Sequence, residues 1–147
     1  MEIKQASLSD IPWIISQLAE FAEFLGTHYN VYGDTEHVSI LVKRLIEDHI
    51  FLIAYKDNSP IGFITGSLAP HPFNPGFIVL SEQAWWISKE HRGSRAGLIL
   101  LDSFIEKGKE LADWITLSSE AHSAISDKHF ESRGFKLQEK TFLMEVL

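Results

Sequence analysis

The stretch KEHRGSRAGLILLDSFIEKGKEL, from Lys89 to Leu111, carries the most information about the fold. Two arginines and two glycines stand directly before a helical pattern of apolar residues. The first N–H groups of a helix lack intrahelical partners, and together with the positive end of the helix dipole they attract phosphate. The junction is therefore a candidate anion cradle. An ordinary strand-to-helix turn with solvated arginines explains the local pattern equally well.

The first third of the chain is predicted to form one strand and two helices. Residues 2–6 have strand character, and a helix with apolar residues at helical spacing begins near Ile11 and ends at Gly26. A second amphipathic helix follows a cap at Asp34 and Thr35.

The middle of the chain is predicted to be rich in β-structure. Residues 50–56 and 61–69 are separated by turn-forming residues and are typical of an antiparallel hairpin. The segment PHPFNPG, residues 70–76, is predicted to be a rigid loop, and a long strand is expected from Phe77 to Ser88. Strict alternation would place one set of side chains on a common face of that strand: Leu80, Glu82, Ala84 and Trp86.

After the helix that follows Gly93, the prediction is a short strand in DWITLSS, a helix over 123–133 ended by Gly134, and one or two strands from 135 to 147. The strands before and after the Gly93 helix are expected to pair in parallel. The fold class is α/β (α+β mixed): a largely antiparallel mixed sheet of six to seven strands, flanked by about four helices. One domain is expected to cover residues 1–147.

Composition limits the classes of function. Thirteen basic and twenty acidic residues give a net charge of −7, which argues against nucleic acid and anionic membranes as partners. The absence of cysteine excludes zinc–thiolate sites and a cysteine nucleophile, and it favours a cytoplasmic location. The seven histidines show no metal-binding spacing, so no metal site is predicted.

The junction resembles the acetyl-coenzyme A loop of the GNAT superfamily of N-acetyltransferases, whose pattern is Gln/Arg-x-x-Gly-x-Gly/Ala. The chain matches this pattern at Arg92 and Gly97 and carries Arg95 in place of the middle glycine. The opening MEIKQASLSDIPWIISQL and the closing HFESRGFKLQE also resemble the family, in the same order. The resemblance implies a GNAT-like fold and transfer of an acetyl group from acetyl-CoA to a primary amine.

The resemblance also implies a coenzyme site. The end of the long strand would contact the pantetheine arm, and the loop after it would hold the pyrophosphate. Ser123 falls where the family often has an asparagine that reaches the pantetheine arm. The predicted coenzyme-binding residues are Trp86, Ile87, Arg92, Gly93, Ser94, Arg95, Ala96, Gly97 and Ser123.

For catalysis, a base must deprotonate the amine, and a backbone N–H near Ile87 would polarise the acetyl carbonyl. Glu82 is the first candidate base, with a solvent-facing strand carboxylate as the alternative. His122 and His129 are further candidates, with helix-surface histidines as the alternative. The position at which many family members have a proton-donating tyrosine is Phe130, which cannot donate a proton.

The acceptor is expected to meet two loops that carry aromatic residues. Predicted contacts are Tyr29, Tyr32, His71 and Phe73, with simple packing as the alternative for each ring. The acceptor amine would belong to a small molecule or a protein, and a homodimer is common among proteins that resemble this one. A catalytically idle acyl-CoA-binding or regulatory domain, and an interaction protein that keeps the fold, are the alternative functions.

Overall fold

The computed structural model describes residues 1–26, 34–120 and 123–146. The chain divides into two compact units, Met1–Leu117 and Ser118–Leu147, and each is described by itself. The single domain over 1–147 therefore stays a prediction.

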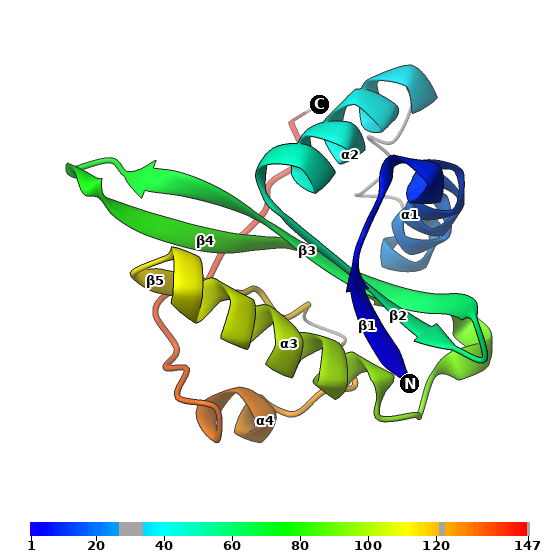
Figure 1. Cartoon of the computed structure of the whole chain (residues 1–147). Helices are drawn as coiled ribbons and strands as arrows, with labels where there is room; N and C mark the ends of the chain where they lie inside the picture. Colours follow the sequence, from blue (N-terminus) through cyan, green and yellow to red (C-terminus); the bar gives the residue numbers. More distant parts are fainter. Residues whose placement is uncertain (27–33, 121–122, 147) are drawn as a thin grey trace. The chain divides into compact units, whose positions relative to one another are not determined.

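The first unit contains a five-stranded mixed sheet (Figure 1). Its strands, in spatial order, are β1 (Glu2–Gln5), β2 (Ile50–Lys56), β3 (Ser59–His71), β4 (Asn74–Ile87) and β5 (Trp114–Thr116). The pairs from β1 to β4 are antiparallel, whereas β4 and β5 run parallel. The predicted parallel pair across the helix after Gly93 is thus confirmed.

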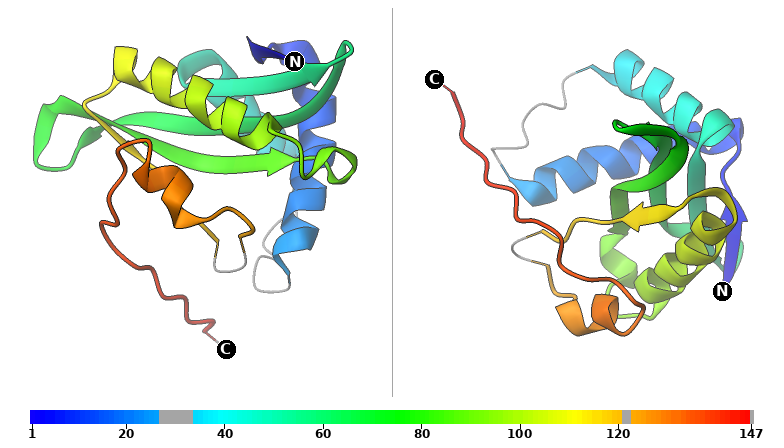
Figure 2. Two further views of the ribbon diagram at one scale, coloured as in Figure 1. Left: turned by 90° about the horizontal axis from the view of Figure 1, so that it is seen from below. Right: turned by 90° about the vertical axis from the view of Figure 1, so that its left-hand side faces the viewer.

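In the described part of this unit, three α-helices cover the two faces of the sheet (Figure 2). They are α1 (Ile11–Leu25), α2 (Thr35–Asp48) and α3 (Ala96–Leu111). The first two lie on one face and α3 lies on the other. Asp34 caps α2 as predicted, because its carboxylate accepts the N–H groups of Glu36 and His37 at 3.0 and 3.3 Å.

Each face of the sheet has its own apolar core. On the α1 and α2 side, Ile14 and Val42 pack with Phe51, Phe63 and Trp86 of the strands. On the α3 side, a separate set of fully buried residues holds the helix to the sheet: Leu80, Leu100, Leu101 and Phe104. Burying side chains of this size stabilises the fold by roughly 1.5–3 kcal/mol each.

The β3–β4 hairpin is longer than the sequence predicts. Residues 70–76 were expected to form a loop, but β3 continues to His71 and β4 begins at Asn74. Proline is tolerated here because, among the described residues, β2 pairs with β3 only as far as Gly66, and Pro70 has no ladder hydrogen bond to lose on that side.

A β-bulge interrupts β4 and corrects the predicted alternation of its side chains. Thr65 pairs with Ala84 while Gly66 pairs with Glu82, so Gln83 is an extra residue. Leu80 therefore belongs to the α3 face, whereas Trp86 packs on α1. Glu82 and Trp86 are not two members of one continuous alternating face.

The second unit contains α4 (Asp127–Glu131), the fourth α-helix of the described residues, followed by Gly134 at φ 95°. No strand forms over its residues 135–146, where Leu137, Phe142 and Val146 are 80 to 90% exposed. The prediction of six to seven strands is wrong for the described residues, which contain five. A strand requires a backbone partner, and strand-like composition does not supply one.

Candidate functional site

The loop between β4 and α3 has a braced backbone. It includes a turn of 3-10 helix at Lys89–His91. The buried Ser88 hydroxyl donates to the Ile61 carbonyl at 2.9 Å and lies 3.1 Å from Nδ1 of His91. Ser94 then donates its hydroxyl to the His91 carbonyl at 2.7 Å, and Gly93 adopts a φ of 79° that favours glycine. These contacts hold the predicted cradle in one conformation.

The backbone N–H groups of this loop are open to a ligand. Residues 92–95 are exposed. Ala96 donates to the Ser94 hydroxyl at 3.4 Å, but five other amides find no acceptor among the described residues: Gly93, Ser94, Arg95, Gly97 and Leu98. Unpaired amides at the N-terminal end of a long helix suit a phosphate group.

The two arginines of the loop have different environments. Arg92 donates from Nε to the Ile87 carbonyl at 3.3 Å, and its guanidinium lies 4.4 and 4.3 Å from the ring centroids of Phe24 and Trp86. Arg95 is exposed at the N-cap of α3 and contacts no acceptor or carboxylate in the described part of the chain. Arg95 is therefore the arginine whose guanidinium is available to an anion.

The end of β4 presents an open edge. Within the described residues, β5 pairs with β4 only from Val79 to Ser81, so the stretch up to Ile87 extends beyond β5. The N–H of Ser88 donates to the Ile61 carbonyl of β3. The Ile87 carbonyl belongs to the same trans peptide group and therefore points in the opposite direction, away from β3. The N–H of Ile87 in this extended strand points the same way.

Of the two strand residues predicted to contact the coenzyme through their backbone, Ile87 is therefore the one that faces the open edge. The backbone of Trp86 faces β3 instead, and its indole is buried and donates to the side chain of Gln17 at 2.9 Å.

Gly97 leaves room above the first turn of α3. A Cβ atom placed there would lie 3.7 Å from the nearest atoms of Ile87 and Trp85, which is ordinary van der Waals contact. The fold itself does not require glycine at this position. An anion that must approach the helix backbone closely does favour it, so the residues present fit a bound diphosphate.

The candidate catalytic residues belong to different units of the chain. Glu82 is half-buried and stands opposite Gly66 at the bulge of the first unit. His129 and Phe130 belong to α4 of the second unit, and Ser123 precedes that helix. The Ser123 hydroxyl accepts the N–H of Ile125 at 3.2 Å. His122 lies outside the described residues.

The predicted acceptor contacts are similarly divided. Tyr29 and Tyr32 lie outside the described residues. His71 and Phe73 lie at the turn of the β3–β4 hairpin, at the opposite end of β4 from Ile87. The 14 residues of β4 span roughly 40 Å at about 3.3 Å each, so the structure separates these two side chains from the loop.

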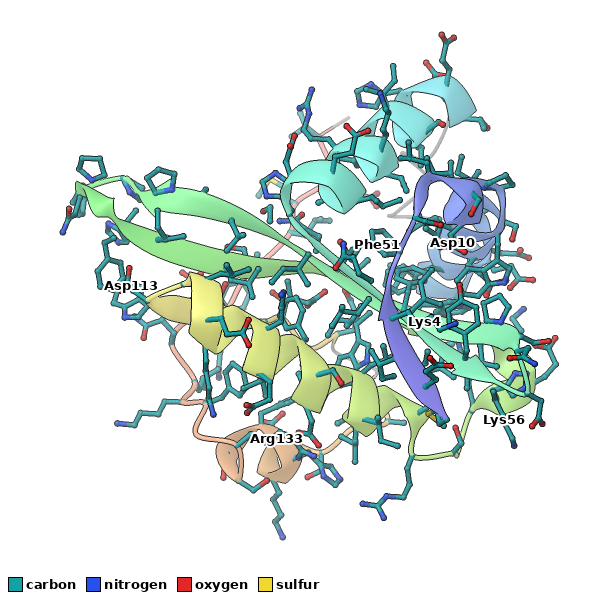
Figure 3. The ribbon with its side chains drawn as sticks, in the orientation of Figure 1. Lys4, Asp10, Phe51, Lys56, Asp113 and Arg133 are labelled. Atoms are coloured by element: carbon teal, nitrogen blue, oxygen red, sulfur yellow. The ribbon has the colours of Figure 1, made fainter. Side chains whose placement is uncertain are left out.

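At the hairpin turn, His71 and Phe73 belong to a ring cluster with Phe77 and Trp114. Neighbouring Asp113 accepts the N–H of Ile78 and thereby joins the start of β5 to β4 (Figure 3). His71 lies against Phe77 and Trp114, whereas Phe73 meets only His71 among the described rings and is 92% exposed. Their contact with an acceptor stays a prediction.

Sequence reasoning missed Phe24 and Gln17, which connect α1 to the end of β4. Phe24 lies 5.6 Å from the Trp86 ring between centroids, and Gln17 accepts the indole N–H. Helical spacing indicated that α1 is amphipathic, but no local signal paired its last turn with residues so far along the chain.

The described residues contain no helix that is long and apolar enough to cross a bilayer, and no cluster of side chains suited to a metal ion.

The sequence model of the Acetyltransferase (GNAT) family matches residues 16–135, which include the loop and the open end of β4. The chain belongs to the GNAT acetyltransferase family. None of the curated protein sequences matches it significantly.

Solved structures of GNAT-like proteins share the fold at low sequence identity. A probable acetyltransferase is 18% identical, with a TM-score of 0.77 over 100% of this chain and 99% of that one. A ribosomal-protein-alanine N-acetyltransferase from Brucella melitensis biovar Abortus 2308 is 17% identical, with a TM-score of 0.72 over 99% of this chain and 100% of that one. A predicted acetyltransferase with acetyl-CoA, from Clostridium acetobutylicum, is 15% identical, with a TM-score of 0.76 over 98% and 95%.

Proposed function

We propose that this GNAT protein is an N-acetyltransferase that moves an acetyl group from acetyl-CoA to a primary amine of a small molecule or protein. The observation that carries the proposal is the set of amides at the start of α3 that have no acceptor among the described residues: Gly93, Ser94, Arg95, Gly97 and Leu98. Coenzyme A has a diphosphate that such amides can bind. The C. acetobutylicum protein of the same fold holds acetyl-CoA, which supports this choice of coenzyme.

Residues of the first unit would hold the coenzyme. The amides of Gly93, Ser94, Arg95 and Gly97 would bind the diphosphate, and the Arg95 guanidinium would add charge-assisted hydrogen bonds. Ile87 would contribute its backbone N–H from the open edge of β4, near the acetyl carbonyl as negative charge develops there.

Acetyl-CoA would supply the acetyl group as a thioester, so that a C–N bond to the amine would form as the C–S bond breaks and the sulfur leaves as a thiolate. An alkylammonium has a pKa near about 10.4, so a base must first remove a proton from it. Glu82 is the candidate base in the first unit, and His129 and His122 remain candidates. After the C–N bond forms, the nitrogen loses a second proton, and the thiolate takes up one proton, so the protons balance. Phe130 cannot donate the proton that the thiolate takes up.

The decisive experiment measures thiol release from acetyl-CoA against a panel of polyamines, aminoglycosides, amino acids and peptides. We expect release that depends on one class of amine. Acetyl-CoA binding without release in the presence of any amine would instead indicate the idle acyl-CoA-binding domain. If calorimetry detects no acetyl-CoA binding, the proposal is wrong.

We also propose that the protein acts in the cytoplasm as a homodimer, without nucleic acid or membranes as partners. The lack of cysteine and the net charge of −7 support the location and the excluded partners, and the family resemblance supports the dimer. Light scattering during size-exclusion chromatography should give about twice the mass of 16.7 kDa, and a monomer mass would refute the dimer.

A further inference from the structure

Three contacts fix the side chain of Arg92. Its guanidinium carbon lies 4.4 Å from the centroid of the Phe24 ring and 4.3 Å from that of Trp86, and its Nε donates to the Ile87 carbonyl. The two rings also meet each other edge to face, with centroids 5.6 Å apart. A guanidinium that lies against two rings and donates a hydrogen bond has less conformational freedom than one surrounded by water.

This arrangement places Arg92 on the α1 face of β4. The Trp86 indole is buried there, against Phe21 and the side chain of Gln17. The first turn of α3 lies on the other face, where Gly97 approaches Ile87 and Trp85. The Arg92 guanidinium and the unpaired amides of α3 are therefore on opposite sides of the strand.

We propose that Arg92 is a positioning residue, which ties the coenzyme loop to the last turn of α1 through Phe24. The inference rests on the proposed function and deepens it. The charge that binds the coenzyme diphosphate comes from Arg95, and Arg92 keeps the loop in its binding conformation. Arg92 also joins this loop to α1, the helix that precedes Tyr29 and Tyr32 in the sequence, which are predicted to contact the acceptor.

Two observations assign the charge to Arg95. Its side chain is exposed, and no described carboxylate or other acceptor occupies it. It also stands at the N-cap of α3, next to the amides of Gly97 and Leu98, where a bound anion would lie. The arginine that departs from the family pattern is thus the one best placed for the phosphate.

Salt dependence of acetyl-CoA binding distinguishes the two roles. We compare Arg92→Gln with Arg95→Gln, a matched pair in one loop, by calorimetry between about 50 and 200 mM salt. We expect Arg95→Gln to flatten the salt dependence, because a direct phosphate contact is lost. Arg92→Gln should weaken binding three- to tenfold while keeping a salt dependence closer to that of the wild type. An equal or greater flattening by Arg92→Gln would overturn the proposal.

A double-mutant cycle tests whether Phe24 acts through Arg92. Phe24 is 53% exposed, so Phe24→Leu should fold, and circular dichroism checks that it does. We expect Phe24→Leu to weaken acetyl-CoA binding two- to fivefold in the wild type and to have no further effect in the Arg92→Gln protein. Phe142→Leu, at a phenylalanine 89% exposed in the second unit, is the matched control and should bind as the wild type does.

The outcomes of the cycle separate the two proposals. Effects of Phe24→Leu and Arg92→Gln that simply multiply, or a Phe24→Leu protein that binds like the wild type, would refute the positioning role. A wild-type protein that does not bind acetyl-CoA would refute the proposed function itself. Arg92→Lys adds a final check: it keeps the charge but loses the planar stack, so its binding should resemble that of Arg92→Gln.

Discussion

At the scale of single residues, the loop illustrates how similar side chains acquire different roles. Arg92 and Arg95 are three positions apart and both exposed, yet one is stacked on two rings and the other has no described partner. Stacking removes rotamer freedom, whereas an unpaired guanidinium can adapt to a phosphate. The environment of each side chain, rather than its type, therefore assigns its role.

Gly97→Ala should separate coenzyme binding from stability. The new methyl group would meet the protein only at 3.7 Å, so we expect the free energy of unfolding to stay the same or rise by about 0.5 kcal/mol. The methyl group would stand where the diphosphate approaches, and acetyl-CoA affinity should fall about tenfold. Urea denaturation and calorimetry measure the two effects.

Gly108→Ala, in the same helix, is the control for this prediction. A Cβ atom there would lie 2.7 and 2.8 Å from side-chain atoms of Ile115 and Leu80, which would have to shift, so this variant should be less stable than Gly97→Ala by about 1 kcal/mol. A Gly97→Ala protein with unchanged affinity would contradict the direct approach of the diphosphate to the first turn of α3.

Tyr55 should give a pH signature at the start of α1. Burial and a 2.9 Å hydrogen bond from its hydroxyl to Asp10, labelled in Figure 3, raise the pKa of Tyr55 to about 12. Because the unfolded value is about 10, the contribution to stability is complete below pH 10 and is lost as the pH rises toward 12.

Tyr55→Phe should accordingly lower the free energy of unfolding by about 1 kcal/mol at pH 8, and its difference from the wild type should shrink by pH 11. In an absorbance titration, at least one of the three tyrosines should ionise late, and Tyr55→Phe should remove that late step. A late step that survives in the variant would show that another tyrosine is responsible.

At the scale of elements, the bulge of β4 decides what each face of the strand meets. The extra residue, Gln83, moves the side chains after it to the other face, so β4 can bury Leu80 under α3 and Trp86 under α1. Beyond Ser81 the strand also leaves β5, which opens the edge that ends at Ile87. The inserted residue, Gln83, thus allows β4 to contribute side chains to both apolar cores, and it follows the candidate base Glu82 in the sequence.

Gly66→Ala should disrupt this element. A Cβ atom at Gly66 would lie 2.7 Å from the Phe104 ring and 2.8 Å from the carbonyl oxygen of Ser81, and a backbone atom cannot move aside easily. We expect the free energy of unfolding to fall by about 1–3 kcal/mol in urea denaturation. Gly76→Ala, whose Cβ would meet only Asn74 at 3.5 Å, is the control and should be nearly neutral.

At the scale of the whole molecule, ligand binding should stabilise the folded chain. A ligand at about 100 times its dissociation constant stabilises by roughly 2.7 kcal/mol, which corresponds to about 5 to 10 °C in melting temperature for a protein of this size. We expect acetyl-CoA and coenzyme A to produce this shift in thermal denaturation. S-acetylpantetheine, which lacks the phosphates, should produce almost none, and an equal shift would contradict a diphosphate site.

Local chemistry was enough to predict most elements of the fold. The Asp34 cap, the hairpin turn after β2 and the periodicity of α3 each depend on a few neighbouring residues, and each was confirmed. The strand predicted after Phe135 was wrong, since a strand depends on a partner that composition does not reveal. The roles of Glu82, His122 and His129 stay predictions.

The sequence by itself determined the order of strands and helices and the strand–loop–helix junction, because periodicity, caps and turn residues act over a few positions. Only the tertiary structure decided that Leu80 packs under α3 while Trp86 packs under α1. It also decided that Arg95, rather than Arg92, has a guanidinium without a partner among the described residues. Those outcomes depend on contacts such as that of Gln17 with Trp86, 69 positions apart, where packing geometry rather than local preference selects the partner.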